Sequence, residues 1–127
     1  MNKELVIWDD SESFLESEER NTNALLAESL YKSGYEAIVR NYTGCTSDPK
    51  IIRQFFETAL PSFKNIGGIG VDLGGGAGFI SSSVAHFSQI QKIYCVEAVS
   101  KVAELLQPLV KKRVLADQHD KVVSVVG

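Results

Sequence analysis

The chain has few cysteines and no long apolar run, and each absence excludes a class of protein. Its two cysteines, Cys45 and Cys95, are too few and too far apart for a disulfide framework or a metal site. No apolar run approaches the roughly 18 residues expected of a membrane span. The N-terminus also lacks a basic segment followed by an apolar block, which would mark a targeting signal. We therefore expect reduced thiols, with Cys95 as core packing, in a cytoplasmic protein without a membrane partner.

Positive charge is also scarce. The 127 residues carry a formal net charge of -3, and the one dense basic cluster is Lys111, Lys112 and Arg113. We interpret this cluster as the last turn of a helix, where cations suit the helix dipole. A protein that grips a nucleic acid by itself usually has a basic face. Nucleic-acid partners are therefore disfavoured, and a small-molecule substrate is favoured. The length and the 44% of hydrophobic residues suit one ordinary globular domain.

Glycine is concentrated in one stretch, Gly70–Gly78, which reads GVDLGGGAG. The apolar run 69–73 predicts a buried parallel strand, and residues 77–87 predict a helix after the glycines. Glycine is needed where the backbone takes a positive φ or lies in contact with a ligand. The stretch therefore predicts a strand, a ligand-binding glycine turn and a helix. The residues of this helix expected to face the sheet are Ile80, Val84 and Phe87.

The spacing of the glycines distinguishes between nucleotide-binding loops. The dinucleotide fingerprint requires glycine at the sixth position from Gly74, where this chain has Phe79. A phosphate loop of the Walker type requires Lys followed by Ser or Thr, which is absent here. The interpretation of the chain as one half of a dehydrogenase domain is therefore disfavoured. The residues Asp72, Gly74, Gly76 and Gly78 instead form an acidic-x-Gly-x-Gly-x-Gly pattern.

Glu97 is the second polar residue expected at this site. It follows the predicted strand 92–96 and lies 19 residues after Gly78. In Rossmann-like sites, an acidic residue at the end of the second strand accepts hydrogen bonds from both ribose hydroxyls. Alone, such a residue is more often a solvated strand end. Its combination with the glycine turn favours ribose binding.

On these residues, the chain from about residue 66 to its end resembles the Rossmann-like (class I) S-adenosylmethionine-dependent methyltransferases. The resemblance implies methyl transfer from S-adenosyl-L-methionine to an unidentified acceptor. It also implies that the Asp72 carboxylate orients the turn, or a water near the methionine moiety, and that Glu97 holds the ribose. The implied cofactor-binding residues are Asp72, Gly74, Gly75, Gly76, Gly78, Glu97 and Ala98. No catalytic base is assigned.

The expected fold class is α/β, with a Rossmann-like parallel sheet in β-α-β-α-β order preceded by N-terminal helices. A second crossover helix should run from Ser100 to about Arg113, kinked or split by Pro108. A polar turn at 116–120, with His119 exposed, should precede a third strand at 121–126.

This arrangement is half of the seven-stranded core that the resemblance implies. We therefore expect residues 66–127 to be the first half of an S-adenosylmethionine-binding domain, in a fragment of a longer enzyme that is inactive alone. Loss of the second half would leave the edge of the first strand unpaired. An unpaired apolar edge predicts self-association.

Residues 1–65 are expected to hold an acidic arm and helices. The acidic run before residue 20 is typical of a solvated arm, while the family resemblance suggests a lid containing Trp8 and Phe14. Helices are predicted over 23–32, with a stop at Gly34, and from the Asp48 cap to Pro61. The secondary structure of residues 35–42 is ambiguous from the sequence, and the preceding helical region could continue through them. Tyr31, Tyr35, Asn41 and Tyr42 are candidates for contact with the cofactor or substrate, although aromatic residues at helical spacing are more often core.

A second functional interpretation retains nucleotide binding by the glycine turn but assigns the chain no enzymatic activity. The chain would then be a non-enzymatic nucleotide-sensing or interaction domain, complete at this length. Because no residue can be named as a catalytic base, the sequence leaves both interpretations open.

Overall fold

The computed structural model describes residues 5–7, 17–42, 46–59 and 61–127. The proposed lid residues Trp8 and Phe14, and the thiol of Cys45, lie outside the described residues. A π-helical turn spans Val102–Leu106, and 3-10 helices span Pro61–Asn65 and Ala116–Lys121. The other elements are β1 Leu5–Ile7, α1 Ser17–Ser33, α2 Tyr35–Asn41, α3 Pro49–Ala59, β2 Gly68–Leu73, α4 Phe79–Ala85, β3 Ile90–Glu97, α5 Gln107–Leu115 and β4 Val122–Val126.

The strands form one sheet in the order β1-β4-β3-β2, and every neighbouring pair is parallel. Strands β2, β3 and β4 lie side by side in chain order, with a helical connection between each and the next. The predicted α/β class and the β-α-β-α-β order are therefore confirmed, and the arrangement is compatible with a Rossmann-like fold. Strand β1 was not predicted, because it lies in the segment that we interpreted as a solvated arm. It pairs with β4, with Leu5 opposite Ser124.

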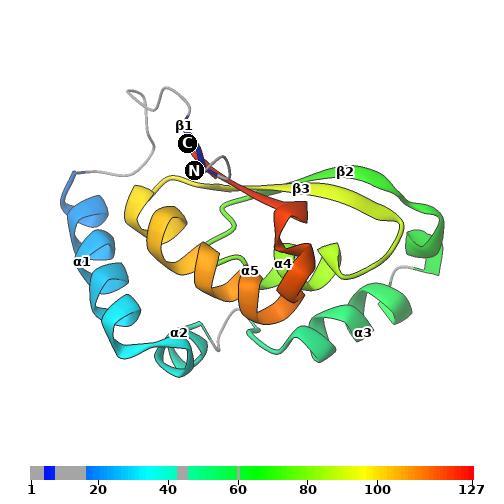
Figure 1. The fold of residues 1–127 in the computed structure, drawn as a ribbon, viewed down its shortest axis with the longest axis horizontal. Helices are drawn as coiled ribbons and strands as arrows, with labels where there is room; N and C mark the ends of the chain where they lie inside the picture. Colours follow the sequence, from blue (N-terminus) through cyan, green and yellow to red (C-terminus); the bar gives the residue numbers. More distant parts are fainter. Residues whose placement is uncertain (1–4, 8–16, 43–45, 60) are drawn as a thin grey trace.

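The described α-helices lie on one side of the sheet (Figure 1). One hydrophobic cluster on this side joins α1, α2 and α3 to α4 and the second crossover helix, and a second cluster lies between α4, α5 and the sheet. Residues 1–65 and 66–127 thus contribute to the same core. The first cluster includes Ala27, Leu30, Ile38, Ile52, Phe79 and Leu106, and the second includes Val84, Ile93, Cys95 and Val122.

The helix boundaries follow local signals. The backbone N–H of Lys50 donates to Asp48 Oδ1 at 2.9 Å, which confirms the predicted cap of α3. Gly34 has a φ of 99° and separates α1 from α2, so residues 35–41 form a helix of their own. Helix α1 begins at Ser17, earlier than predicted. The second crossover helix is continuous over residues 100–115 and is not split at Pro108, but its winding changes to a π-helical turn just before this proline, at the start of α5.

Strand β2 is an edge strand, so the prediction that this strand is buried was wrong. On its face turned away from the helices, Ile69, Val71 and Leu73 are 67%, 61% and 76% exposed. Ile80 on α4 is also 43% exposed, whereas we expected it to face the sheet. The reasons differ, because Ile69, Val71 and Leu73 lie on the sheet face that no described helix covers, whereas Ile80 lies beside the β2 edge, which has no neighbouring strand among the described residues.

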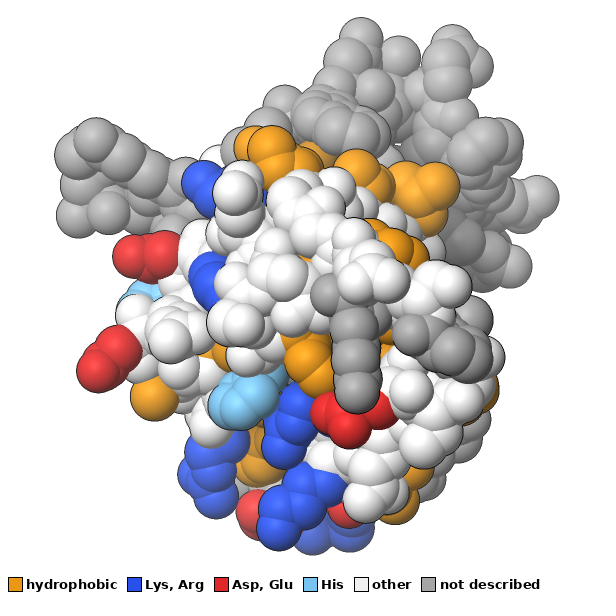
Figure 2. Space-filling model, turned by 90° about the vertical axis from the view of Figure 1, so that its right-hand side faces the viewer, with side chains coloured by type: hydrophobic (Ala, Val, Ile, Leu, Met, Phe, Trp, Pro, Cys, Tyr) orange, Lys and Arg blue, Asp and Glu red, His pale blue; other side chains and the backbone are white. Residues whose placement is uncertain are grey.

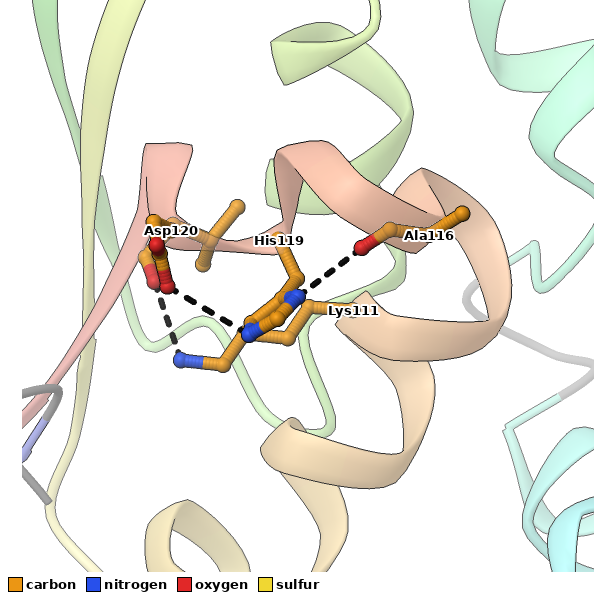
Figure 3. A network of polar contacts seen from close by, with 5 residues as sticks. Lys111, Ala116, His119 and Asp120 are labelled. Atoms are coloured by element: carbon orange, nitrogen blue, oxygen red, sulfur yellow. Dashed lines mark hydrogen bonds and ion pairs between the residues drawn. The ribbon is translucent and has the colours of Figure 1, made fainter. Parts of the chain in front are cut away.

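The connection from α5 to β4 confirms one prediction in part and corrects another (Figure 3). Lys112 and Arg113 lie in the last turn of α5, as predicted, whereas Lys111 lies just before this turn, is 1% exposed, and donates from its Nζ to the Val122 carbonyl at 3.0 Å. The side chain of His119 is 26% exposed, and so partly buried. Its Nδ1 lies 2.8 Å from the carbonyl of Ala116, and its Nε2 lies 3.3 Å from Asp120 Oδ1. These contacts fix the chain as it enters β4.

The surface is divided by side-chain type. Figure 2 shows hydrophobic side chains gathered in the upper part of the view, towards the sheet, and most Lys and Arg side chains towards the bottom. In the part of the chain that the structure describes, no helix combines the length and the apolar character needed to cross a lipid bilayer.

Candidate functional site

The glycine turn and Glu97 meet at one edge of the sheet. The turn, Gly74–Gly78, follows β2, and Glu97 ends the parallel neighbouring strand β3. The Gly75 N–H donates to the Val96 carbonyl at 2.9 Å, and the Gly76 N–H donates to Glu97 Oε1 at 3.1 Å. The two sequence motifs, 21 residues apart, are thus joined by a direct hydrogen bond. Ligands of open parallel sheets bind at this carboxyl end of the strands.

The glycines of the turn are needed for two different reasons. Gly74, Gly76 and Gly78 have φ values of 69°, 56° and 90°, a region that other residues rarely adopt. Gly75 has no such φ, but a β-carbon there would overlap the Cys95 sulfur and lie 3.3 Å from Asp72 Oδ2. Conformation therefore requires three of the glycines, and close packing requires the fourth.

Cys95 lies in β3 directly against the turn, with its side chain fully buried. Burial raises the pKa of its thiol to about 12, and a hydrogen bond with Ser81 partly opposes this shift. The thiol is therefore protonated at neutral pH and inert as a nucleophile. This agrees with the prediction that Cys95 is a packing residue.

Two buried polar side chains that the sequence did not reveal hold the turn in place. The Ser81 hydroxyl donates to Asp72 Oδ2 at 2.6 Å, which links α4 to the end of β2. The Gln107 Nε2 donates to the Gly76 carbonyl at 2.8 Å, although Gln107 is far along the chain and 1% exposed. The one sequence signal for this contact was that Gln107 lies among the apolar residues of the predicted second crossover helix, where a polar side chain needs a partner.

Two pockets open beside the turn. The first, here called the Glu97 pocket, has a volume of about 300 Å³ and lies between the turn, the end of β3 and helix α1. The second, here called the Asp72 pocket, has a volume of about 240 Å³. The Glu97 pocket is lined by Asn23, Leu26, Ala27, Leu30, Tyr42, Gly76, Glu97, Val99, Val102 and Leu106. The Asp72 pocket is lined by Tyr42, Thr46, Asp72, Gly74, Gly75, Gly76, Ala77, Phe79 and Ile80.

Tyr42 is common to the two pockets. A β-carbon built on Gly76 would lie 3.2 Å from its Cε1, so the ring lies against the turn itself. The ring also packs on Phe79, with a centroid separation of 6.1 Å. The structure therefore places Tyr42 at the site, as the sequence allowed. Tyr31 is 48% exposed and Tyr35 also packs against Phe79, but neither of them lines the two pockets.

The remaining implied residues lie next to the pockets and not in their walls. Gly78 is the buried residue before α4, and Ala98 is half-buried after β3. Val99 provides the wall there, and its N–H donates to Glu97 Oε2 at 2.9 Å. Each oxygen of the Glu97 carboxylate thus accepts one backbone hydrogen bond. Because a carboxylate offers about four acceptor positions, both oxygens retain capacity for a ligand donor.

Comparison of the chain with protein-family models, with curated proteins and with solved structures gives no match. The function proposed below is therefore based on the geometry of the two pockets.

Proposed function

We propose that this chain binds S-adenosyl-L-methionine and forms the cofactor-binding portion of a methyltransferase with a small-molecule acceptor. The observation that carries the proposal is the Glu97 pocket. It brings a carboxylate with free acceptor capacity and a glycine turn against one cavity, at the carboxyl ends of two parallel strands. The β2-α4-β3-α5-β4 unit supports it further, since this order matches half of a seven-stranded methyltransferase core.

The residues fit the parts of this cofactor. Glu97 accepts hydrogen bonds from the two ribose hydroxyls, and the apolar walls from α1 and the π-helical turn enclose the base. The glycine turn lets the methionine moiety lie close to the backbone. When bound, the cofactor supplies a methyl group on a sulfonium that is already a good leaving group. The part of this chain is then to bind and orient the cofactor.

The charges around the turn also select between nucleotides. Glu97 lines one pocket and Asp72 lines the other, so a carboxylate lies on either side of the turn. A carboxylate on each side of the turn disfavours a pyrophosphate and favours a ligand that carries positive charge. S-adenosylmethionine has a sulfonium and an ammonium, whereas NAD has two phosphates. The electrostatics therefore agree with the failure of the dinucleotide fingerprint.

Calorimetric titration tests the proposal. We expect S-adenosylhomocysteine, the demethylated product, to bind with a stoichiometry of about one, and we expect no heat of binding for NAD under the same conditions. Adenosine should bind more weakly than S-adenosylhomocysteine, because it lacks the part that contacts the glycine turn. NAD binding in place of S-adenosylhomocysteine would contradict the proposal, as would the absence of binding to both nucleotides by chain that is folded by circular dichroism.

An interaction domain remains the second candidate, and the observation that favours it is the edge of β2, which pairs with no strand among the described residues. A third cavity, of about 320 Å³, runs along this edge between β2, α4 and the α3 region. Its walls are mainly apolar and include Phe56, Ile66, Ile69, Val71, Ile80 and Val84. An apolar strand edge beside such a cavity can recruit another strand.

We expect the chain to self-associate through this edge. Val71 lies in the middle of β2 and is 61% exposed, so Val71→Lys places a charge where a second strand would pair. Light scattering should show oligomers of the wild type at about 100 µM. Val71→Lys should raise the dissociation constant of these oligomers at least ten-fold, which corresponds to about 1.4 kcal/mol, and so favour the monomer. Leu25→Lys is the matched control, because Leu25 is 67% exposed on α1, away from β2. A monodisperse wild-type monomer at this concentration would contradict the expectation.

A further inference from the structure

Helix α1 lines the Glu97 pocket with one face. Asn23, Leu26, Ala27 and Leu30 are spaced at i, i+3, i+4 and i+7, so they lie along a single stripe of the helix. Three members of this stripe are apolar, as expected for a wall that encloses a planar ligand. Asn23 is the polar exception. An amide on an otherwise apolar stripe facing a cavity suggests recognition of a polar edge.

The amide of Asn23 is available for such a contact. Asn23 is half-buried, and within the described ranges its side chain has no hydrogen-bond partner. The pocket wall formed by Val99, Val102 and Leu106 is apolar and offers no competing side-chain donor or acceptor. Glu97, which has spare acceptor capacity, is the charged residue of the same pocket. The uncharged polar side chains that line this pocket are Asn23 and Tyr42, and the Tyr42 ring lies against the glycine turn. A ligand held by Glu97 at its ribose would therefore place its base between the apolar wall and helix α1, where Asn23 supplies the amide.

We propose that the Asn23 amide recognises the base of the bound nucleoside, and that it selects a purine with a 6-amino group. An asparagine amide can donate one hydrogen bond and accept another side by side, which matches the donor and acceptor that adenine presents along one edge. The 6-amino group is the donor of that pair, so a purine with hydrogen at this position loses one of the two bonds. This inference rests on the proposed function, because it takes Glu97 as the ribose ligand.

The test compares S-adenosylhomocysteine with its analogue that has hydrogen in place of the 6-amino group. By calorimetry, the wild type should bind the adenine compound about ten-fold more tightly than the analogue. Asn23→Ala should bind the two compounds within about two-fold of each other, mainly through a loss of affinity for the adenine compound. Asn23→Asp keeps an acceptor for the amino group and should retain part of the preference.

Asn21→Ala is the matched control, because Asn21 is an exposed asparagine on the same helix. It should keep the wild-type affinity and the wild-type preference. A folded Asn23→Ala variant that binds S-adenosylhomocysteine and still prefers it ten-fold would overturn the role of Asn23 and leave the proposed function intact. Failure of the wild type to bind S-adenosylhomocysteine would instead overturn the proposed function, and the role of Asn23 with it. If Asn23→Ala is unfolded by circular dichroism, Asn23→Leu takes its place, because leucine fills a similar volume without a donor or an acceptor, and an unchanged ten-fold preference in Asn23→Leu would overturn the inference.

Discussion

Gly75→Ala should lower the free energy of unfolding by about 3 kcal/mol, at the upper end of the cost of overpacking a core. The added methyl group would overlap the sulfur of Cys95, which is fully buried, and would press on the Asp72 carboxylate at 3.3 Å. The turn has little freedom to yield, because the Gly75 N–H is bonded to the Val96 carbonyl at 2.9 Å. Urea denaturation followed by circular dichroism measures the effect.

Cys95→Ala should rescue this variant. Removing the sulfur costs about 1 kcal/mol by itself, but it also removes the atom that the new methyl group would overlap. Gly75→Ala/Cys95→Ala should therefore be more stable than the sum of the single changes predicts, with a coupling energy of about 1–3 kcal/mol. Gly74→Ala is the control, since Gly74 has a φ of 69° and nothing within 4 Å of an added β-carbon. It should cost about 1 kcal/mol through backbone strain alone, with no rescue by Cys95→Ala. Additive effects at Gly75 and Cys95 would show that the packing explanation is wrong.

The elements that could be predicted are those with strong local signals. The strand, glycine turn and helix from β2 to α4 and the cap at Asp48 each depend on neighbouring residues, and all are present. The irregularity expected at Pro108 is present as a π-helical turn before it. Strand β1 was missed because its three residues are stabilised by pairing with β4, more than 100 residues away. So short a segment cannot show the alternation on which strand prediction rests.

The candidate site divides in the same way. Asp72, the glycines and Glu97 form a recognisable motif, and the structure brings them together. Gln107 and Lys111 belong to a helix that the sequence did predict, but their roles depend on which way that helix faces. The wall that α1 contributes to the Glu97 pocket depends on packing between helices far apart in sequence. Such contacts follow from the fold as a whole, which hydrophobic periodicity does not specify.

Glu97→Ala should reduce the affinity for S-adenosylhomocysteine about 100-fold, which corresponds to about 2.7 kcal/mol. The loss has two physical sources. The ribose hydroxyls lose a charged acceptor, at about 1.5–3 kcal/mol for each such hydrogen bond. In addition, the N–H groups of Gly76 and Val99 lose the oxygens that hold them at 3.1 Å and 2.9 Å, so the turn is less ordered before the ligand binds.

Glu97→Gln separates these two sources, because the amide keeps one oxygen for the backbone but has no charge and turns an NH₂ group towards the second N–H. We expect its stability without ligand to lie between the wild type and Glu97→Ala, and its affinity to fall at least ten-fold. Glu104→Gln, at an exposed glutamate of the π-helical turn, removes the same charge outside the pocket and should change affinity less than two-fold. Calorimetry gives the affinities and thermal unfolding without ligand gives the stabilities. Wild-type affinity in a folded Glu97→Ala variant would show that this carboxylate orders the turn without binding the nucleoside.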